Sequence, residues 1–107
     1  MSDTDAILFA NETFYRAFAD KDMETMADLW SRDNPVSCLH PGWGPLFDRS
    51  EVISSWAAIL NAPEAPDIRC VNPTVHLFQD LGTVICFEQL EARLMVATNV
   101  FVREGSL

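Results

Sequence analysis

The spacing of apolar residues predicts helices in the first half of the chain. Apolar side chains recur every three or four positions in residues 4–19, in residues 23–30 and in the stretch that follows Asp48. This spacing gives each segment one apolar stripe, as in an amphipathic helix. Asp22 is the expected N-cap of the second helix, and Asp48 with Glu51 forms the capping-box pattern expected at the start of the third.

Beyond residue 67 the pattern changes to that of strands. Three runs rich in β-branched and aromatic residues predict antiparallel strands: residues 68–78, 83–91 and 94–103. We expect turns at residues 79–82 and near Arg93. Pro73 cannot donate to a β ladder, so a bulge or a sheet edge is expected there. The chain thus predicts one α+β domain over residues 1–107, with three helices packed on one face of a curved, mainly antiparallel sheet.

Residues 34–56, between the second and third helices, concentrate unusual side chains. They include one of two histidines, two of three tryptophans, two of four glycines and three of six prolines. Residues 35–40 predict a short strand ending in His40, and residues 41–47 predict a turn carrying Trp43. Two interpretations fit. His40 is either a pocket group, or a structural histidine bound to a backbone carbonyl with both tryptophans in the core.

Composition narrows the choice of partners. The chain has 16 acidic and 7 basic residues, a net charge of −9, and such a charge repels phosphate backbones, so nucleic acid is not an expected partner. No apolar stretch approaches the roughly 18 residues of a membrane helix, and no basic segment precedes an apolar run at the start, so neither membrane insertion nor export is expected. The three cysteines lie apart in predicted strands, which favours free thiols in a reducing cytoplasm.

Two polar side chains of the predicted strands, Glu88 and Asn99, have alternative interpretations. Glu88 shares a strand face with apolar residues and is either a pocket acid or a strand-end glutamate facing solvent or a dimer partner. Asn99 is either a pocket hydrogen-bonding group or a structural amide. His76 is expected at the surface or a dimer face, and Asn11 on the polar side of the first helix. No metal-ligand spacing is present, so we expect neither a metal nor a cofactor.

Several motifs resemble those of a known family. They are KDMETMADLW, the His40-Pro-Gly-Trp run, DRSEV, VICFEQLE and ATNVFVREG. With the order of elements, they resemble the NTF2-like superfamily, and within it the SnoaL-like, ketosteroid-isomerase-related group of small bacterial proteins. The resemblance implies a cone-shaped domain with a pocket between sheet and helices, which usually dimerises through the sheet. Such domains commonly continue past the position of Gly105 into one more strand, so we expect that strand to be missing or replaced.

The resemblance also implies positions for chemistry. Ketosteroid isomerases use an aspartate immediately before a proline as general base, and His40 occupies that position here. A neutral imidazole can also accept a proton. The isomerases' oxyanion-hole tyrosine lies eight residues before the aspartate that begins the second helix, which is Phe14 here. Phenylalanine has no donor, and Tyr15 is turned by about 100° around the helix, so steroid isomerisation is not expected.

Two functions are compatible with the sequence. The first is an isomerase, hydratase or cyclase that transfers a proton next to a carbonyl, with His40 and Glu88 as catalytic residues. The second is a noncatalytic ligand-binding or dimerisation module. Either would bind a small apolar or carbonyl-containing molecule, and a homodimer is expected because the strands carry apolar residues on both faces. The candidate substrate-binding residues are Phe14, Tyr15, Trp30, Trp43, Trp56 and Asn99.

Overall fold

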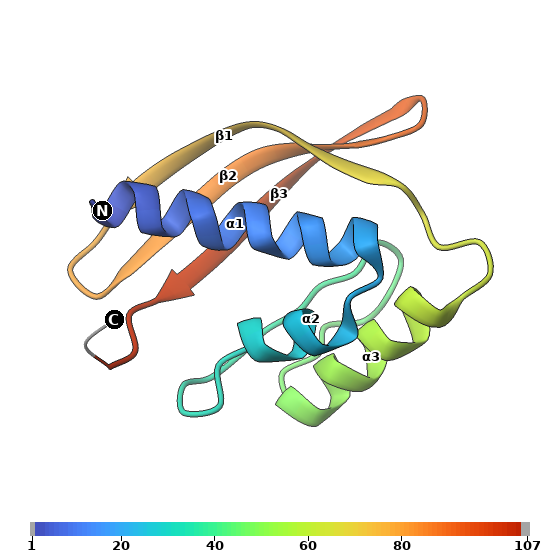
Figure 1. Cartoon of the computed structure of the whole chain (residues 1–107), viewed down its shortest axis with the longest axis horizontal. Helices are drawn as coiled ribbons and strands as arrows, with labels where there is room; N and C mark the ends of the chain where they lie inside the picture. Colours follow the sequence, from blue (N-terminus) through green and yellow to red (C-terminus); the bar gives the residue numbers. More distant parts are fainter. Residues whose placement is uncertain (1, 106–107) are drawn as a thin grey trace.

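Three helices precede a three-stranded antiparallel sheet in the computed structural model, which describes residues 2–105. The elements are α1 (Asp3–Asp20), α2 (Met23–Leu29), α3 (Arg49–Asn61), β1 (Ile68–Leu77), β2 (Leu81–Leu90) and β3 (Arg93–Val102). Helix α1 runs along the sheet, while α2 and α3 pack together beside one end of it (Figure 1). The α+β architecture predicted from the apolar periodicity is confirmed, and no described helix is long and apolar enough to cross a membrane.

The helix starts differ in how they are capped. The side chain of Asp22 accepts a hydrogen bond from the Thr25 backbone N–H at 3.1 Å, so the predicted cap of α2 is confirmed. Asp48 is also at an N-cap position, but its side chain accepts from the Ser50 hydroxyl and makes no cap hydrogen bond. The capping box predicted for α3 is therefore wrong, because a neighbouring hydroxyl takes the carboxylate that would have capped the helix.

The sheet has the order β1-β2-β3, with β2 in the centre. Its register places Cys70 opposite Glu88 and Glu88 opposite Met95. The pairing of β1 shifts between Val71 and Thr74, where Asn72 has a φ of 53°. This is the irregularity predicted at Pro73, which lacks the N–H that a regular ladder needs.

The strand predicted at residues 35–40 does not form. A single bridge between Cys38 and Leu46 is present instead, with N···O distances of 2.9 and 3.0 Å. Pro35, Pro41 and Pro45 explain the difference, since each removes a backbone donor and fixes its own φ. The segment is therefore a loop folded back on itself, and it carries His40 between the helices and the sheet.

The core lies where the three helices meet. Met26 and Val52 are completely buried and Trp56 is 4% exposed. A second buried layer lies under α1, where Val84 and Cys86 face inward from β2. Gly82 allows this close packing, because a Cβ there would meet the Ile7 side chain at 2.1 Å. Helix α1 is thus seated directly on the sheet, which fixes the side chains that face the cavity described below.

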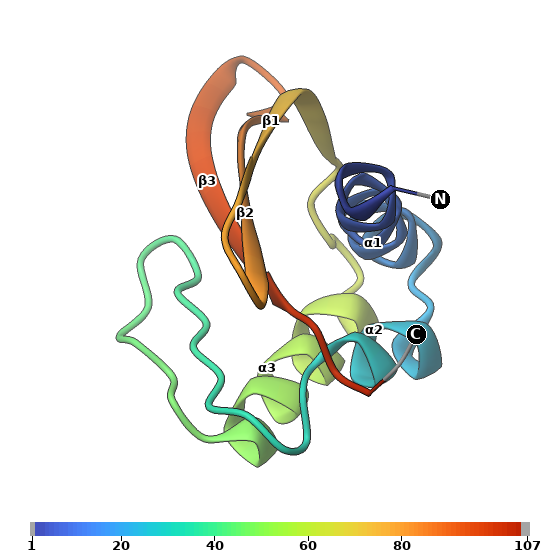
Figure 2. The ribbon, with the colours of Figure 1, turned by 90° about the vertical axis from the view of Figure 1, so that its left-hand side faces the viewer.

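No described helix covers the opposite face of the sheet (Figure 2). Apolar side chains from β2 and β3 are exposed on this face: Ile85, Phe87, Leu94, Val96, Val100 and Val102. Their alternation with inward-facing residues is the two-sided apolar pattern noted in the sequence. This surface is called the outer sheet face below.

Candidate functional site

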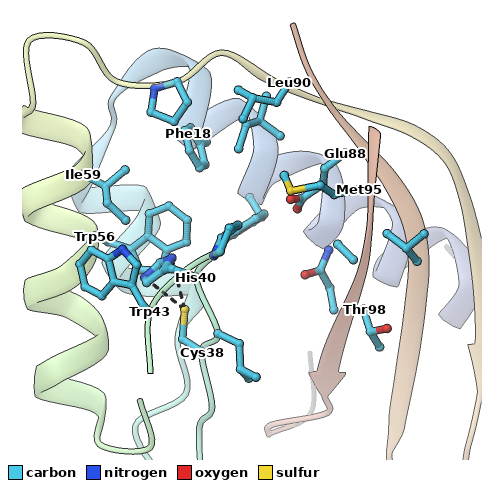
Figure 3. A pocket seen from close by; sticks show the side chains of 18 of the residues that line it. Phe18, Cys38, His40, Trp43, Trp56, Ile59, Glu88, Leu90, Met95 and Thr98 are labelled. Atoms are coloured by element: carbon cyan, nitrogen blue, oxygen red, sulfur yellow. Dashed lines mark hydrogen bonds between the residues drawn. The ribbon is translucent and has the colours of Figure 1, made fainter. Parts of the chain in front are cut away.

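A cavity of about 630 Å³ lies between α1, α3, the loop that carries His40, and the inner side of the sheet. His40, Trp43 and Trp56 lie on one side of it, while Glu88 and Met95 face them from the strands (Figure 3). Most of the wall is apolar, and five aromatic side chains contribute: Phe14, Phe18, Trp30, Trp43 and Trp56. Concave apolar cavities with a few polar groups are typical ligand sites.

His40 is held between two indole rings. Its ring centroid lies 4.9 Å from that of Trp43 and 4.8 Å from that of Trp56, both in edge-to-face orientations. The side chain is 8% exposed, and this burial lowers its pKa from the ordinary value of 6.5 because the charged form loses hydration. His40 is therefore mostly neutral at pH 7, which is the form that can accept a proton.

The hydrogen bonds of Ser55 define which nitrogen of His40 is basic. Ser55 Oγ donates to the carbonyl of Val52 at 2.6 Å, and it lies 2.9 Å from His40 Nε2. A serine hydroxyl has one hydrogen; when it is donated to the Val52 carbonyl, Nε2 carries the ring proton and donates to Ser55. Nδ1 then keeps its lone pair; Cys38 Sγ lies 4.0 Å from Nδ1 and 3.5 Å from Nε2. The partner of Nε2 is a hydroxyl group and not the backbone carbonyl considered from the sequence.

The sheet contributes a second polar group to the same cavity. Glu88 and Asn99 both face inward from neighbouring strands and line the cavity. Tyr15 donates its hydroxyl hydrogen to Glu88 Oε2 at 2.6 Å, and Asn99 Nδ2 donates to Tyr15 Oη at 3.1 Å. Asn99 Nδ2 also donates to Asn11 Oδ1 at 2.8 Å. Burial raises the pKa of Tyr15 far above its ordinary value, so the phenol stays protonated.

Asn11 was expected on the polar side of α1, and this expectation is wrong. Asn11 is 2% exposed and is satisfied by Asn99 and by Cys70, whose Sγ accepts from Nδ2 at 3.5 Å. A buried amide is stable only when such partners are present. The neighbouring Glu12 does lie outside, where it pairs with Arg16.

The structure brings most of the candidate residues together. His40, Glu88 and Asn99 line the cavity, as do the aromatic candidates on α1, α3 and the loop. Tyr15 is not among the lining residues, but it is 7% exposed and contacts two that are. His76 is exposed on β1, away from this site.

Two positioning residues were missed from the sequence, Ser55 and Asn11. Ser55 lies three residues after Val52, on the buried face of α3, and that position was a usable signal. Asn11 gave the same kind of signal, because it lies four residues before Tyr15 and seven before Phe18, on the buried face of α1.

The thiols of Cys38, which is buried, and Cys70, which is half-buried, are unreactive at neutral pH. Burial raises the pKa of Cys38 to about 11, although the nearby indole N–H of Trp56 lowers it in part. That N–H does not reach hydrogen-bond geometry with any group in residues 2–105. Burial and the nearby Cys86 raise the pKa of Cys70 to about 11. Neither thiol is therefore a nucleophile at neutral pH, and no group of three or more metal-ligating side chains occurs in the described part of the chain.

Solved structures with similar chains support the fold. One is a protein of the NTF2-like family from Streptomyces avermitilis, provisionally described as a dehydratase. It is 34% identical with a TM-score of 0.80, and the match covers 91% of this chain and 82% of that one. Another comes from Thiobacillus denitrificans and is provisionally described as a calcium/calmodulin-dependent protein kinase type II association domain. It is 29% identical with a TM-score of 0.75, and the match covers 89% and 81% of the two chains.

Sequence comparisons agree. The F-box protein SKIP8 of Arabidopsis thaliana is 29% identical over 101 residues, which is 92% of this chain. The chain spans only 43% of the length of that relative. The family model of the SnoaL-like domain matches residues 7–106. The chain therefore belongs to the SnoaL-like domain family, within the NTF2-like superfamily.

Proposed function

We propose that this domain is an enzyme that transfers a proton next to a carbonyl group of a small molecule, with Nδ1 of His40 as the base. One observation carries the proposal: His40 and the Glu88–Asn99 pair line the same largely apolar cavity. A base and a second polar group converging on one cavity distinguish a catalytic site from a simple binding pocket.

Each group has a defined part in this reaction. Nδ1 of His40 takes the proton from the carbon next to the carbonyl, while Ser55 holds the ring by accepting from Nε2–H. The imidazolium then returns the proton to another carbon, which gives isomerisation, or to a departing hydroxyl group, which gives dehydration. Glu88 and Asn99 orient the substrate from the other side, and the aromatic walls exclude water.

The relative from Streptomyces avermitilis supports the second of these outcomes. It is provisionally described as a dehydratase and is 34% identical to this chain. Dehydration of a β-hydroxy carbonyl compound begins with abstraction of the same type of proton.

The three free thiols, at positions 38, 70 and 86, support a reducing compartment such as the cytoplasm.

Proton exchange tests the proposal without knowledge of the natural substrate. A panel of β-hydroxy ketones and cyclic enones is incubated with the protein in deuterium oxide, and loss of the α-proton signal is followed by NMR. His40→Asn should slow exchange by about 10²-fold or more, while His76→Asn, which removes the exposed histidine, should not. Equal exchange by both variants would exclude His40 as the base.

The outer sheet face supports an association role as a second function. Val96 and Val100 are 67% and 58% exposed, and no described helix covers them. Exposed apolar patches of this kind mark association surfaces. The relative from Thiobacillus denitrificans is provisionally described as an association domain. We propose that this face forms a homodimer, which would approach the cavity at Val96, a residue of both the outer sheet face and the cavity lining.

A further inference from the structure

On the inner face of β2 and β3, the hydrogen-bond donors of Asn99 and Tyr15 are already used within the protein. Both amide hydrogens of Asn99 are used, one by Asn11 and one by Tyr15. The hydrogen of Tyr15 is donated to Glu88 Oε2. Glu88 Oε1 and Asn99 Oδ1 make no hydrogen bond within residues 2–105. This wall therefore offers acceptors to the cavity, and a ligand must supply the donor.

The charged residues around the cavity indicate what kind of donor the ligand carries. Among residues 2–105, Glu88 is the only acidic residue that lines the cavity, and neither lysine nor arginine lines it. Glu88 forms no ion pair with residues 2–105, and the chain as a whole carries a net charge of −9. A carboxylate between apolar walls is costly unless a cation or strong donors meet it. Anionic ligands are disfavoured here, and a cation is the best match.

The remaining walls suit the rest of such a ligand. The side chains of Phe14, Trp30 and Trp43 present aromatic surface to the cavity. Aromatic rings attract alkylammonium groups through their π faces and also pack against apolar bodies. Trp43 is 50% exposed, so part of this surface can be reached from solvent.

We propose that the cavity recognises a hydrophobic molecule bearing a protonated amine, whose ammonium group pairs with Glu88 while its body lies among the aromatic side chains. The inference rests on the proposed function and adds a substrate class to it. A carbonyl group close to His40 would then be fixed from the opposite end, by the ion pair with Glu88. The amine supplies both the donor and the positive charge that the cavity wall lacks.

Three probes with one body and different head groups test this directly. 1-Adamantylmethylamine, 1-adamantanemethanol and 1-adamantanecarboxylate are titrated into the protein by isothermal calorimetry. In the wild type the amine should bind about tenfold or more tightly than the alcohol, because hydrogen bonds to a charged group are the stronger ones. The carboxylate should bind most weakly. This ranking needs no variant, so it does not depend on how a substitution affects folding.

Single-residue variants then test whether the preference for the amine comes from Glu88. Glu88→Gln keeps an acceptor for Tyr15 and should reduce the amine's affinity to that of the alcohol. Glu64→Gln removes one exposed carboxylate elsewhere and should change nothing. Equal affinity for amine and alcohol, or an amine preference that survives Glu88→Gln, would overturn the inference while leaving proton exchange by His40 intact. Failure of all three probes to bind would also overturn the inference, and proton exchange would still test the proposed function separately.

Discussion

His40 Nε2 lies 2.9 Å from Ser55 Oγ, so a loop side chain is fixed by a helix side chain 15 residues later in the sequence. Ser55 is itself held by the carbonyl of Val52. The contact leaves the imidazole with one hydrogen-bonded nitrogen and one basic nitrogen. The ring itself lies between Trp43 and Trp56. The acid-base property of the site therefore depends on a serine that cannot itself act as the base.

Ser55→Ala should disturb the tautomer of His40. Loss of the acceptor leaves the buried Nε2–H without a partner, which should cost about 1 to 3 kcal/mol of unfolding free energy. Nitrogen-15 NMR of the imidazole should show protonated Nε2 in the wild type and a mixture of tautomers in the variant. Ser54→Ala, an exposed serine on the same helix, is the control. An unchanged tautomer in Ser55→Ala would mean that another group positions the ring.

Stability should decrease as the pH falls below about 6.5, the ordinary pKa of histidine. Burial lowers the pKa of His40 in the folded state, so the unfolded chain binds the proton first and is favoured by acid. This contribution changes by at most about 1.4 kcal/mol per pH unit for one group.

Urea unfolding between pH 5 and 8 measures this effect. His40→Asn should flatten the slope near pH 6, and His76→Asn, an exposed position, should keep it. A slope that is equally steep in His40→Asn would assign the effect to other groups.

The sequence predicted the three helices and the three long strands, but it left open whether Glu88 and Asn99 face the cavity. Strand alternation places Glu88 on the same face as Val84 and Cys86, and that face is the inner one. The same alternation on β3 groups Asn99 with the residues of the inner face. Alternation is a local property of the chain, so it shows which residues share a face but not which face is buried.

The partners of the site residues could not be predicted in this way. Asn11 is buried because Asn99, 88 residues later, meets it across α1 and β3. Ser55 meets His40 because the proline-rich loop folds back onto α3 and does not continue as a strand. Both contacts depend on the tertiary arrangement, and helical periodicity contains no information about it.

Trp56→Ala should be strongly destabilising, by about 3 to 5 kcal/mol in urea denaturation. Trp56 is 4% exposed, and its ring contacts those of Phe14, Phe18 and His40. Trp43→Ala is the matched comparison, because Trp43 is 50% exposed and should cost much less. A loss below about 1 kcal/mol for Trp56→Ala would be incompatible with the cavity that such a truncation creates in a packed core.

The homodimer should be visible by light scattering at micromolar concentration. Val100→Lys places a charge in the outer sheet face, where Val100 is 58% exposed, and should shift the protein to monomer while the fold is kept. Phe9→Lys changes an apolar residue of similar exposure, 60%, on α1 and should leave the dimer intact. A monomeric wild type would remove the association role.

The pH dependence of α-proton exchange tests the central claim most directly. If neutral His40 is the base, the wild-type rate should rise with pH and reach a plateau with a midpoint below 6.5, since burial lowers the pKa of this side chain. His76→Asn should reproduce that profile, and His40→Asn should lack the plateau. A plateau with the same midpoint in His40→Asn, or no exchange above the buffer rate in the wild type, would contradict the account.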